Sequence, residues 1–253
     1  MPRLRGRLGR VLRSPRVART GEFLTAEWRW LAMANHVVEP ALLVPRVPQG
    51  LELDVFDGTA LVSLVGFRFL GTRLLGIGVP FHRDFDEVNL RFYVRRRMTD
   101  GWRRGVVFVR ELVPRRALAA VARLAYGEPY SAVRMDHRLD ADGQSVEYRW
   151  RWGGRWCSLG LETGPGWTTP EVGSEMAFIT EHFWGYSGGQ GRRTREYEVQ
   201  HPPWRVRAAA SATTTGDLGE IYGPDLGAAL SGPPRSAFLA EGSAVTVHRP
   251  TRL

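Results

Sequence analysis

The sequence contains no lysine, and all 35 of its basic residues are arginine. A guanidinium group stays protonated in proteins, so arginine cannot serve as the amine nucleophile that attacks a carbonyl carbon. Chemistry that proceeds through a lysine imine is therefore excluded from the functions expected of this chain.

Cysteine and long apolar runs are also scarce. Cys157 is the one cysteine, so no internal disulfide and no zinc site built on several thiolates can form. A single thiol fits a reducing compartment, and we expect a cytoplasmic protein. The sequence has no run of about 18 apolar residues, so we expect no transmembrane segment.

Positive charge is concentrated at the N-terminus. Residues 1–20 hold seven arginines and no acid, and the other 28 arginines nearly balance the 26 acids of the chain. We expect residues 1–21 to form a basic, disordered tail. The spacing of Leu4, Leu8, Val11 and Leu12 also fits a short amphipathic helix, which leaves open an anionic membrane surface, loose phosphate contacts or a mitochondrial presequence.

The rest of the chain, residues 22–253, predicts a single domain that is mainly β with a few helices (α+β). Short alternating segments are separated by turn signals such as Asp57-Gly58 and Gly153-Gly154. The expected strands cover 51–56, 59–67, 87–96, 105–112, 130–139, 145–152, 155–162, 195–200, 204–213 and 237–247. Strands joined by tight turns favour an antiparallel sheet that closes on itself.

Three helices are expected in this body. Residues 25–34 begin with Thr25 at the N-cap position and continue with good helix formers. Residues 117–126 precede Gly127, which is typical of a helix C-terminus. Residues 175–184 form the third expected helix.

Six short segments, in this order, resemble the YqjF-like family, which has no assigned function. They are WLAMAN (30–35), PQGLELD (48–54), EVNLRFYV (87–94), GVVF (105–108), ARLAYGEPY (122–130) and HPPW (201–204). Each segment is short, but their order and spacing extend over most of the chain and make the set specific.

That family in turn resembles acetoacetate decarboxylase, which implies a closed antiparallel β-barrel or cone around a buried pocket. In that enzyme a pair of lysines follows a Gly-x-Pro turn, and one of them forms an imine with the keto acid. Gly127 and Pro129 keep the turn here, whereas Tyr130 and Ser131 occupy the two lysine positions. The resemblance therefore implies the fold and the pocket without the nucleophile.

Three polar residues alternate along one expected strand. Glu87, Asn89 and Arg91 share one face of it, and Val88 and Leu90 lie on the other. If the polar face points into a barrel, Arg91 offers a fork for a carboxylate, Glu87 a general base and Asn89 an orienting hydrogen bond. A buried Glu–Arg ion pair with a structural role and a solvated face are the alternatives.

The segment that replaces the lysine motif supplies further candidates. Tyr130 either donates to a ligand carbonyl, with a part in proton transfer, or packs in the core. Arg123 is either a pocket residue or a charge on the helix surface, and Ser131 lacks the histidine and carboxylate partners of a nucleophile. The catalytic candidates are Glu87 and Tyr130. The ligand-binding candidates are Arg91, Asn89, Arg123 and Tyr130.

No metal and no cofactor are expected. The six histidines lack the spacing of a metal-binding motif. A polar loop before a strand explains equally well the densest group of metal-type ligands, which comprises His82, Asp84, Asp86 and Glu87. Alternating arginine and tryptophan at 149–156 fits either stacking on single-stranded bases or core packing in a hairpin, and packing is favoured.

Two functions of different classes follow. The first is binding of a small carboxylate or carbonyl compound in a barrel pocket; any catalysis there would be acid–base chemistry of the lyase or isomerase kind. The second is a non-catalytic interaction protein whose arginine-rich tail contacts an anionic partner, either a membrane surface or nucleic acid. No specific nucleic acid partner is expected, and monomer and homo-oligomer both stay open.

Overall fold

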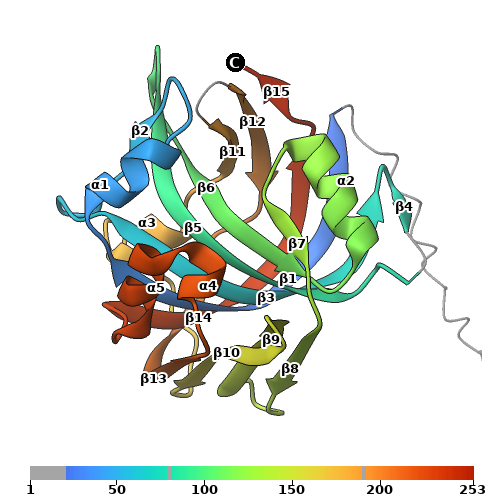
Figure 1. Cartoon of the computed structure of the whole chain (residues 1–253), viewed down its shortest axis with the longest axis vertical. Helices are drawn as coiled ribbons and strands as arrows, with labels where there is room; N and C mark the ends of the chain where they lie inside the picture. The colour runs from blue at the N-terminus through green and yellow to red at the C-terminus, as the bar shows by residue number, and fades with distance from the viewer. Residues whose placement is uncertain (1–20, 79–80, 190–191) are drawn as a thin grey trace, which may run out of the picture.

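The computed structural model of the chain describes residues 21–78, 81–189 and 192–253, and they form a mainly β structure with a few helices (Figure 1). The long strands are β1 (Glu22–Val37), β3 (Leu61–Leu74), β5 (Phe85–Met98), β6 (Gly101–Val113), β9 (Ser145–Trp152), β10 (Arg155–Thr163), β12 (Arg192–Gln200), β13 (Val206–Thr215) and β14 (Ser236–His248). The short strands are β2 (Glu52–Leu53), β4 (Ile77–Gly78), β7 (Tyr130–Ala132), β8 (Met135–Leu139), β11 (Trp184–Gly189) and β15 (Thr251–Arg252). The helical segments are α1 (Pro40–Leu43), η1 (Val44–Arg46), α2 (Arg116–Tyr126), α3 (Glu175–Thr180), α4 (Gly219–Tyr222) and α5 (Pro224–Ser231). The tail predicted at the N-terminus lies outside the described residues, apart from Gly21.

The strand pairings return on themselves. Hydrogen-bonded neighbours follow the order β12, β11, β6, β5, β3, β1 and β14, and β14 pairs again with β12. Most pairings are antiparallel, but β6 runs parallel to both β11 and β7, which corrects the wholly antiparallel sheet that we predicted. Parallel neighbours need long connections, and α2 supplies the connection between β6 and β7.

The central strands β1, β3 and β5 are buried on both faces. One face packs against β9, β10, α4 and α5 through residues such as Leu64 and Leu90. The other face carries Met33 and Val65 and points into the space that the ring of strands encloses. Figure 1 shows the layer of β8, β9, β10 and β13 on the side of the sheet that carries Leu64 and Leu90. Neither face of β5 meets water between Phe85 and Val94, so the polar residues in that part of the strand are buried with it, whereas Arg97 near its end is exposed.

The segment that we predicted as a helix at 25–34 is the middle of strand β1, so that prediction is wrong. Alanine, leucine and methionine favour a helix locally, but β1 pairs with β14 on one side and with β3 on the other. Those two ladders satisfy the backbone N–H and C=O groups, and burial of both faces outweighs the small differences in helix propensity.

Helix α2 confirms the prediction for 117–126. Gly127 ends it in the left-handed conformation, with φ of 72°, and its N–H donates to the carbonyl oxygen of Arg123. The third expected helix is shorter than predicted, because α3 ends at Thr180 and Trp184 already belongs to β11.

The strand predictions fail where neighbouring residues pair with different parts of the sheet. The expected strand at 130–139 divides into β7, which pairs with β6, and β8, which pairs with β9. The expected strand at 51–56 contributes only the two residues of β2. The prediction for 145–152 agrees with β9 at both ends.

Two further findings concern the helices. Helix α2 packs against β6 and β7, and it covers one side of the space inside the ring (Figure 1). No helix in the described residues is long and apolar enough to cross a bilayer.

Candidate functional site

A cavity of about 260 Å³ lies inside the ring of strands, and the polar face of β5 forms part of its wall. Glu87, Asn89 and Arg91 all line it, with exposed fractions of 3%, 2% and 9%. Their alternation along the strand places the three side chains on one face, and this face is the inner one. The solvated-face alternative for these residues is therefore wrong.

The neighbouring strands extend this polar face sideways. In the strand registers, Asn89 pairs with Glu111 on β6, and Glu111 pairs with Tyr130 on β7. Paired residues point to the same side of a sheet with Cβ atoms about 5 Å apart. Glu128, just before β7, also lines the cavity and is 4% exposed. The wall thus carries three buried carboxyl groups, on Glu87, Glu111 and Glu128.

A β-bulge on β6 determines what stands beside Arg91. The register shifts between Leu90 and Arg91, so that Leu90 pairs with Arg110 but Arg91 pairs with Phe108. The extra residue, Val109, packs instead with the core on the outer side of the sheet. The bulge therefore turns Phe108 into the cavity, where simple alternation from Glu111 would have placed Val109.

Hydrogen bonds connect the polar groups in pairs. Asn89 donates from Nδ2 to Glu87 Oε1 at 2.9 Å, and the Tyr130 hydroxyl donates to Glu87 Oε2 at 3.3 Å. The Tyr197 hydroxyl, from β12, donates to Glu128 Oε1. Glu111 Oε2 and Asn89 Oδ1 are buried without a partner.

Burial changes the acidity of all three carboxyl groups. It raises the pKa of Glu87 to about 7, although the hydrogen bonds from Asn89 and Tyr130 oppose the rise. Burial raises the pKa of Glu128 to about 8, and Glu87 adds to the effect. The pKa of Glu111 lies well above its usual value because of burial and the nearby Glu128 and Glu87 carboxyls. Near neutral pH the cluster therefore retains protons that exposed carboxyl groups would have lost.

Arg91 lies beside this cluster without pairing to it. Its Nη2 donates to the carbonyl oxygen of Ile179 at 3.3 Å, and its Nε has no partner. No carboxylate oxygen in the described part of the chain comes within ion-pair distance of its guanidinium group, so the structural ion pair that we kept as an alternative does not form. The positive charge of Arg91 still lowers the pKa of Glu87, against the larger effect of burial.

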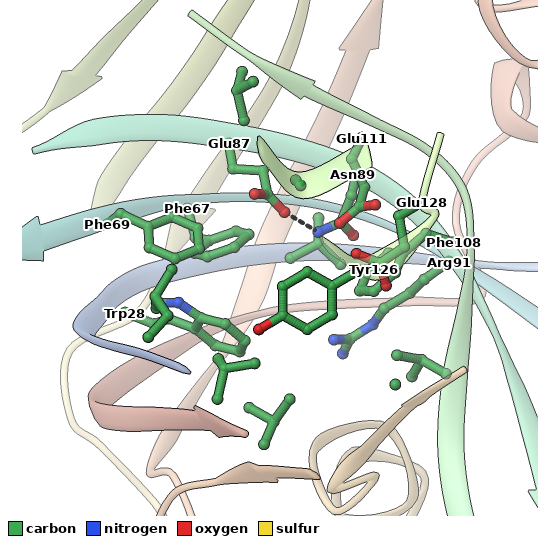
Figure 2. A pocket seen from close by; sticks show the side chains of 18 of the residues that line it. Trp28, Phe67, Phe69, Glu87, Asn89, Arg91, Phe108, Glu111, Tyr126 and Glu128 are labelled. Atoms are coloured by element: carbon green, nitrogen blue, oxygen red, sulfur yellow. Dashed lines mark hydrogen bonds between the residues drawn. The ribbon is translucent and has the colours of Figure 1, made fainter. Parts of the chain in front are cut away.

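The rest of the cavity wall is mainly apolar and aromatic. Trp28, Phe67 and Phe69 lie at the other end of the cavity from Arg91 (Figure 2). Their rings contact one another edge to face or tilted, with centroids 5.2 to 5.6 Å apart. The cavity therefore has a charged end and an aromatic end.

The remaining candidates lie elsewhere. Arg123 is exposed on α2, outside the cavity lining, and its Nε donates to the Ala119 carbonyl oxygen. Ser131 accepts a hydrogen bond from Arg110 and does not line the cavity. Trp150 is fully buried, which agrees with core packing for that tryptophan.

The acidic group before β5 is divided among separate contacts. His82 lines the cavity, whereas Asp84 accepts a hydrogen bond from the Gly71 N–H. Asp86 pairs with His137 at 2.9 Å. No group of three metal-ligating side chains is assembled in the part of the chain that is described.

Sequence reasoning missed Glu111, Glu128 and Tyr197. Glu128 lies in the segment ARLAYGEPY, two residues before Tyr130. Residues two apart in an extended segment point to the same side, so this spacing could have identified it. Glu111 and Tyr197 gave no comparable signal, because only the pairing of β6 with β5 and β7, and the closure through β12, bring them to the cavity.

Comparisons with known structures agree with this architecture. An acetoacetate decarboxylase from Legionella pneumophila has a TM-score of 0.68 at 11% identity, over 96% of this chain and 92% of that one. The enduracididine biosynthesis enzyme MppR, solved in complex with pyruvate, has a TM-score of 0.64 at 13% identity, over 92% and 91% of the two chains. These likenesses show an acetoacetate decarboxylase-like fold.

Comparisons of sequence are more specific. The uncharacterized protein YqjF of Bacillus subtilis (strain 168) is 25% identical over 200 residues, which cover 78% of this chain and 80% of that protein. The model of the DUF2071 family, described as an uncharacterized conserved protein, matches residues 25–244. With its YqjF-like sequence and its acetoacetate decarboxylase-like fold, this chain belongs to the DUF2071 family.

Proposed function

We propose that this protein binds a small carboxylate or carbonyl compound in the cavity, without Schiff-base chemistry. The strand ring acts as a closed cone around the ligand, within one domain that spans residues 22–253. Arg91 and Asn89 hold the ligand, and Glu87 and Tyr130 are placed for proton transfer. The chain has no lysine, so imine formation with a side-chain amine has no candidate residue.

The observation that carries this proposal is the state of Arg91. Arg91 is 9% exposed, yet its side-chain hydrogen bonds go to neutral atoms, the carbonyl oxygen of Ile179 and the sulfur of Met33. A buried cation without a paired anion is costly, and a ligand carboxylate would remove that cost through two parallel N–H···O bonds. The Nε–H of Arg91, which has no partner in the described residues, is a further donor of the same guanidinium group.

Glu87 supplies the acid–base element. A carboxyl group with a pKa of about 7 exists in both protonation states at neutral pH, which suits proton transfer to and from a carbon beside a carbonyl group. Tyr130 donates its hydroxyl hydrogen to the same carboxyl group, so it orients Glu87 and stands beside the reacting position. The likeness to MppR, solved with pyruvate, supports a keto acid as one ligand class to test.

The test is a thermal-shift screen of small carboxylates, keto acids and neutral ketones. Wild type is compared with Arg91→Ala and with Arg123→Ala, a matched variant that removes an arginine outside the cavity. A ligand at 100 times its Kd stabilises its protein by about 2.7 kcal/mol, which is readily measured. We expect a carboxylate to stabilise wild type and Arg123→Ala but not Arg91→Ala.

If the ligand stabilises Arg123→Ala as little as it stabilises Arg91→Ala, the guanidinium group of Arg91 has no specific role in binding. If no acid or ketone in the screen shifts the wild type, the binding function is refuted. The Tyr130→Phe variant separates the two halves of the proposal: it should retain binding and lose any ligand proton exchange, which NMR in D₂O detects.

A further inference from the structure

Among the described residues, the wall of the cavity carries three carboxyl groups, on Glu87, Glu111 and Glu128, and one guanidinium group, on Arg91. Burial lowers the pKa values of His182 and His201, which also line it, to about 4, and the chain has no lysine to add a second cation. A carboxylate ligand bound by Arg91 alone would add a further negative charge to this wall. A ligand that also brings a positive charge would instead be complementary to the carboxyl cluster.

Two acceptor atoms in the cavity wall have no hydrogen-bond donor in the described part of the chain. They are Glu111 Oε2 and Asn89 Oδ1, which belong to residues that are 1% and 2% exposed and that line the cavity. They occupy paired positions on β6 and β5, so they face the cavity next to each other. Figure 2 shows the Glu87, Glu111 and Glu128 carboxyls gathered around the Asn89 side chain. A buried acceptor without a donor is costly, and a ligand N–H group would satisfy it.

We propose that the ligand is a zwitterion, a 2-amino acid with an apolar side chain, whose ammonium group binds Glu111 and Asn89 while its carboxylate binds Arg91. This inference rests on the proposed function, since it takes the role of Arg91 from it, and it assigns the second half of the ligand. Glu87 and Glu128 line the same cavity, and their oxygens are further acceptors for the ammonium group.

The other end of the cavity fits the apolar side chain. Trp28, Phe67 and Phe69 provide an aromatic wall there, and the cavity of about 260 Å³ has room for a compact apolar group. An ammonium group has three donors, so it can serve the Glu111 and Asn89 acceptors and still reach a third oxygen. A keto acid of the same carbon skeleton offers no donor at this position.

Binding of a cation here has a distinctive proton signature. The titratable groups of the described residues that line this cavity are Glu87, Glu111, Glu128, Tyr126, Tyr130, Tyr197, His82, His182, His201 and Arg91. Burial and mutual repulsion keep protons on the three acids, and their pKa values are all raised. An arriving ammonium group replaces one of those protons, so a 2-amino acid releases a proton on binding. A 2-oxo acid adds negative charge and therefore takes a proton up or leaves the count unchanged.

The experiment is isothermal titration calorimetry of the full chain at pH 7.5 with two matched pairs of probes. The pairs are L-phenylalanine with phenylpyruvate and L-leucine with 4-methyl-2-oxopentanoate. Titrations in phosphate and in Tris, which differ in ionisation enthalpy, give the number of protons exchanged. We expect each amino acid to bind at least about tenfold more tightly than its oxo acid and to release about one proton.

A Glu111→Gln variant tests the assignment to that side chain. It should weaken the amino acid at least about tenfold more than the oxo acid, because it removes charge and leaves the size unchanged. Proton release is measured on wild type, so the proposal stays testable even if the variant does not fold. If oxo acids bind and amino acids bind no better, or bind without releasing a proton, the zwitterion inference is wrong and the proposed function stands. If neither class binds, both are wrong.

Discussion

The stability of this protein should fall as the pH rises through neutrality, and Glu128 allows the reasoning to be tested. Burial raises the pKa of Glu128 from 4.5 to about 8, so the folded state binds this proton more tightly than the unfolded state. For a group with a raised pKa, the stabilisation is complete below the unfolded value of 4.5 and is lost as the pH approaches 8. Glu87 and Glu111 shift in the same direction and add to the slope.

The magnitude follows from the proton affinity. A tenfold change in proton affinity is worth about 1.4 kcal/mol, so the rise from 4.5 to about 8 corresponds to as much as roughly 5 kcal/mol of unfolding free energy. Glu128→Gln removes the charge and keeps an oxygen that accepts the hydrogen bond from Tyr197. We expect the variant to be about 3 to 5 kcal/mol more stable than wild type at pH 8.5 and nearly equal to it at pH 4.5.

Urea denaturation followed by tryptophan fluorescence at both pH values measures this difference. Glu171→Gln is the matched control, because Glu171 is exposed and its substitution should change the stability by less than about 0.5 kcal/mol at either pH. A wild type that is equally stable at pH 4.5 and 8.5 would refute the reasoning. So would a Glu128→Gln variant that loses stability at pH 8.5.

Three further predictions concern buried residues of the protein. Asp54 accepts a hydrogen bond from Arg104 at 2.6 Å and pairs with His182 at 3.1 Å, so Asp54→Ala should cost about 1 to 3 kcal/mol in urea denaturation, because it leaves the buried His182 without its partner. A loss below about 0.5 kcal/mol would contradict this role of Asp54. A Cβ atom at Gly185 would overlap with the Tyr197 phenol, so Gly185→Ala should cost about 1 to 3 kcal/mol and weaken any ligand, whereas Gly164→Ala, with open space around it, should do neither. Cys157 is 3% exposed, and burial raises the pKa of its thiol, so a thiol reagent should modify it rapidly in urea and very slowly in the native protein. Rapid labelling of the native protein would show that the core around Cys157 opens.

Local chemistry in the sequence was sufficient to predict some elements. Gly127 marked the end of α2 because a residue without a Cβ atom adopts the left-handed conformation at little cost. The alternation along β5 placed Glu87, Asn89 and Arg91 on one face, and this periodicity is a property of the strand itself. The absence of lysine likewise needs no fold to be known.

The tertiary structure decided everything that depends on pairing between distant segments. Thr25 and the residues after it form a strand because β3 and β14 flank them, although their local preference is helical. The registers of β6 with β5 and β7, together with the bulge at Val109, bring Glu111 to the cavity and turn Phe108 inward. A contact across the sheet depends on registers set by the whole core, so the sequence alone could identify one polar strand but not the cluster of three acids that surrounds it.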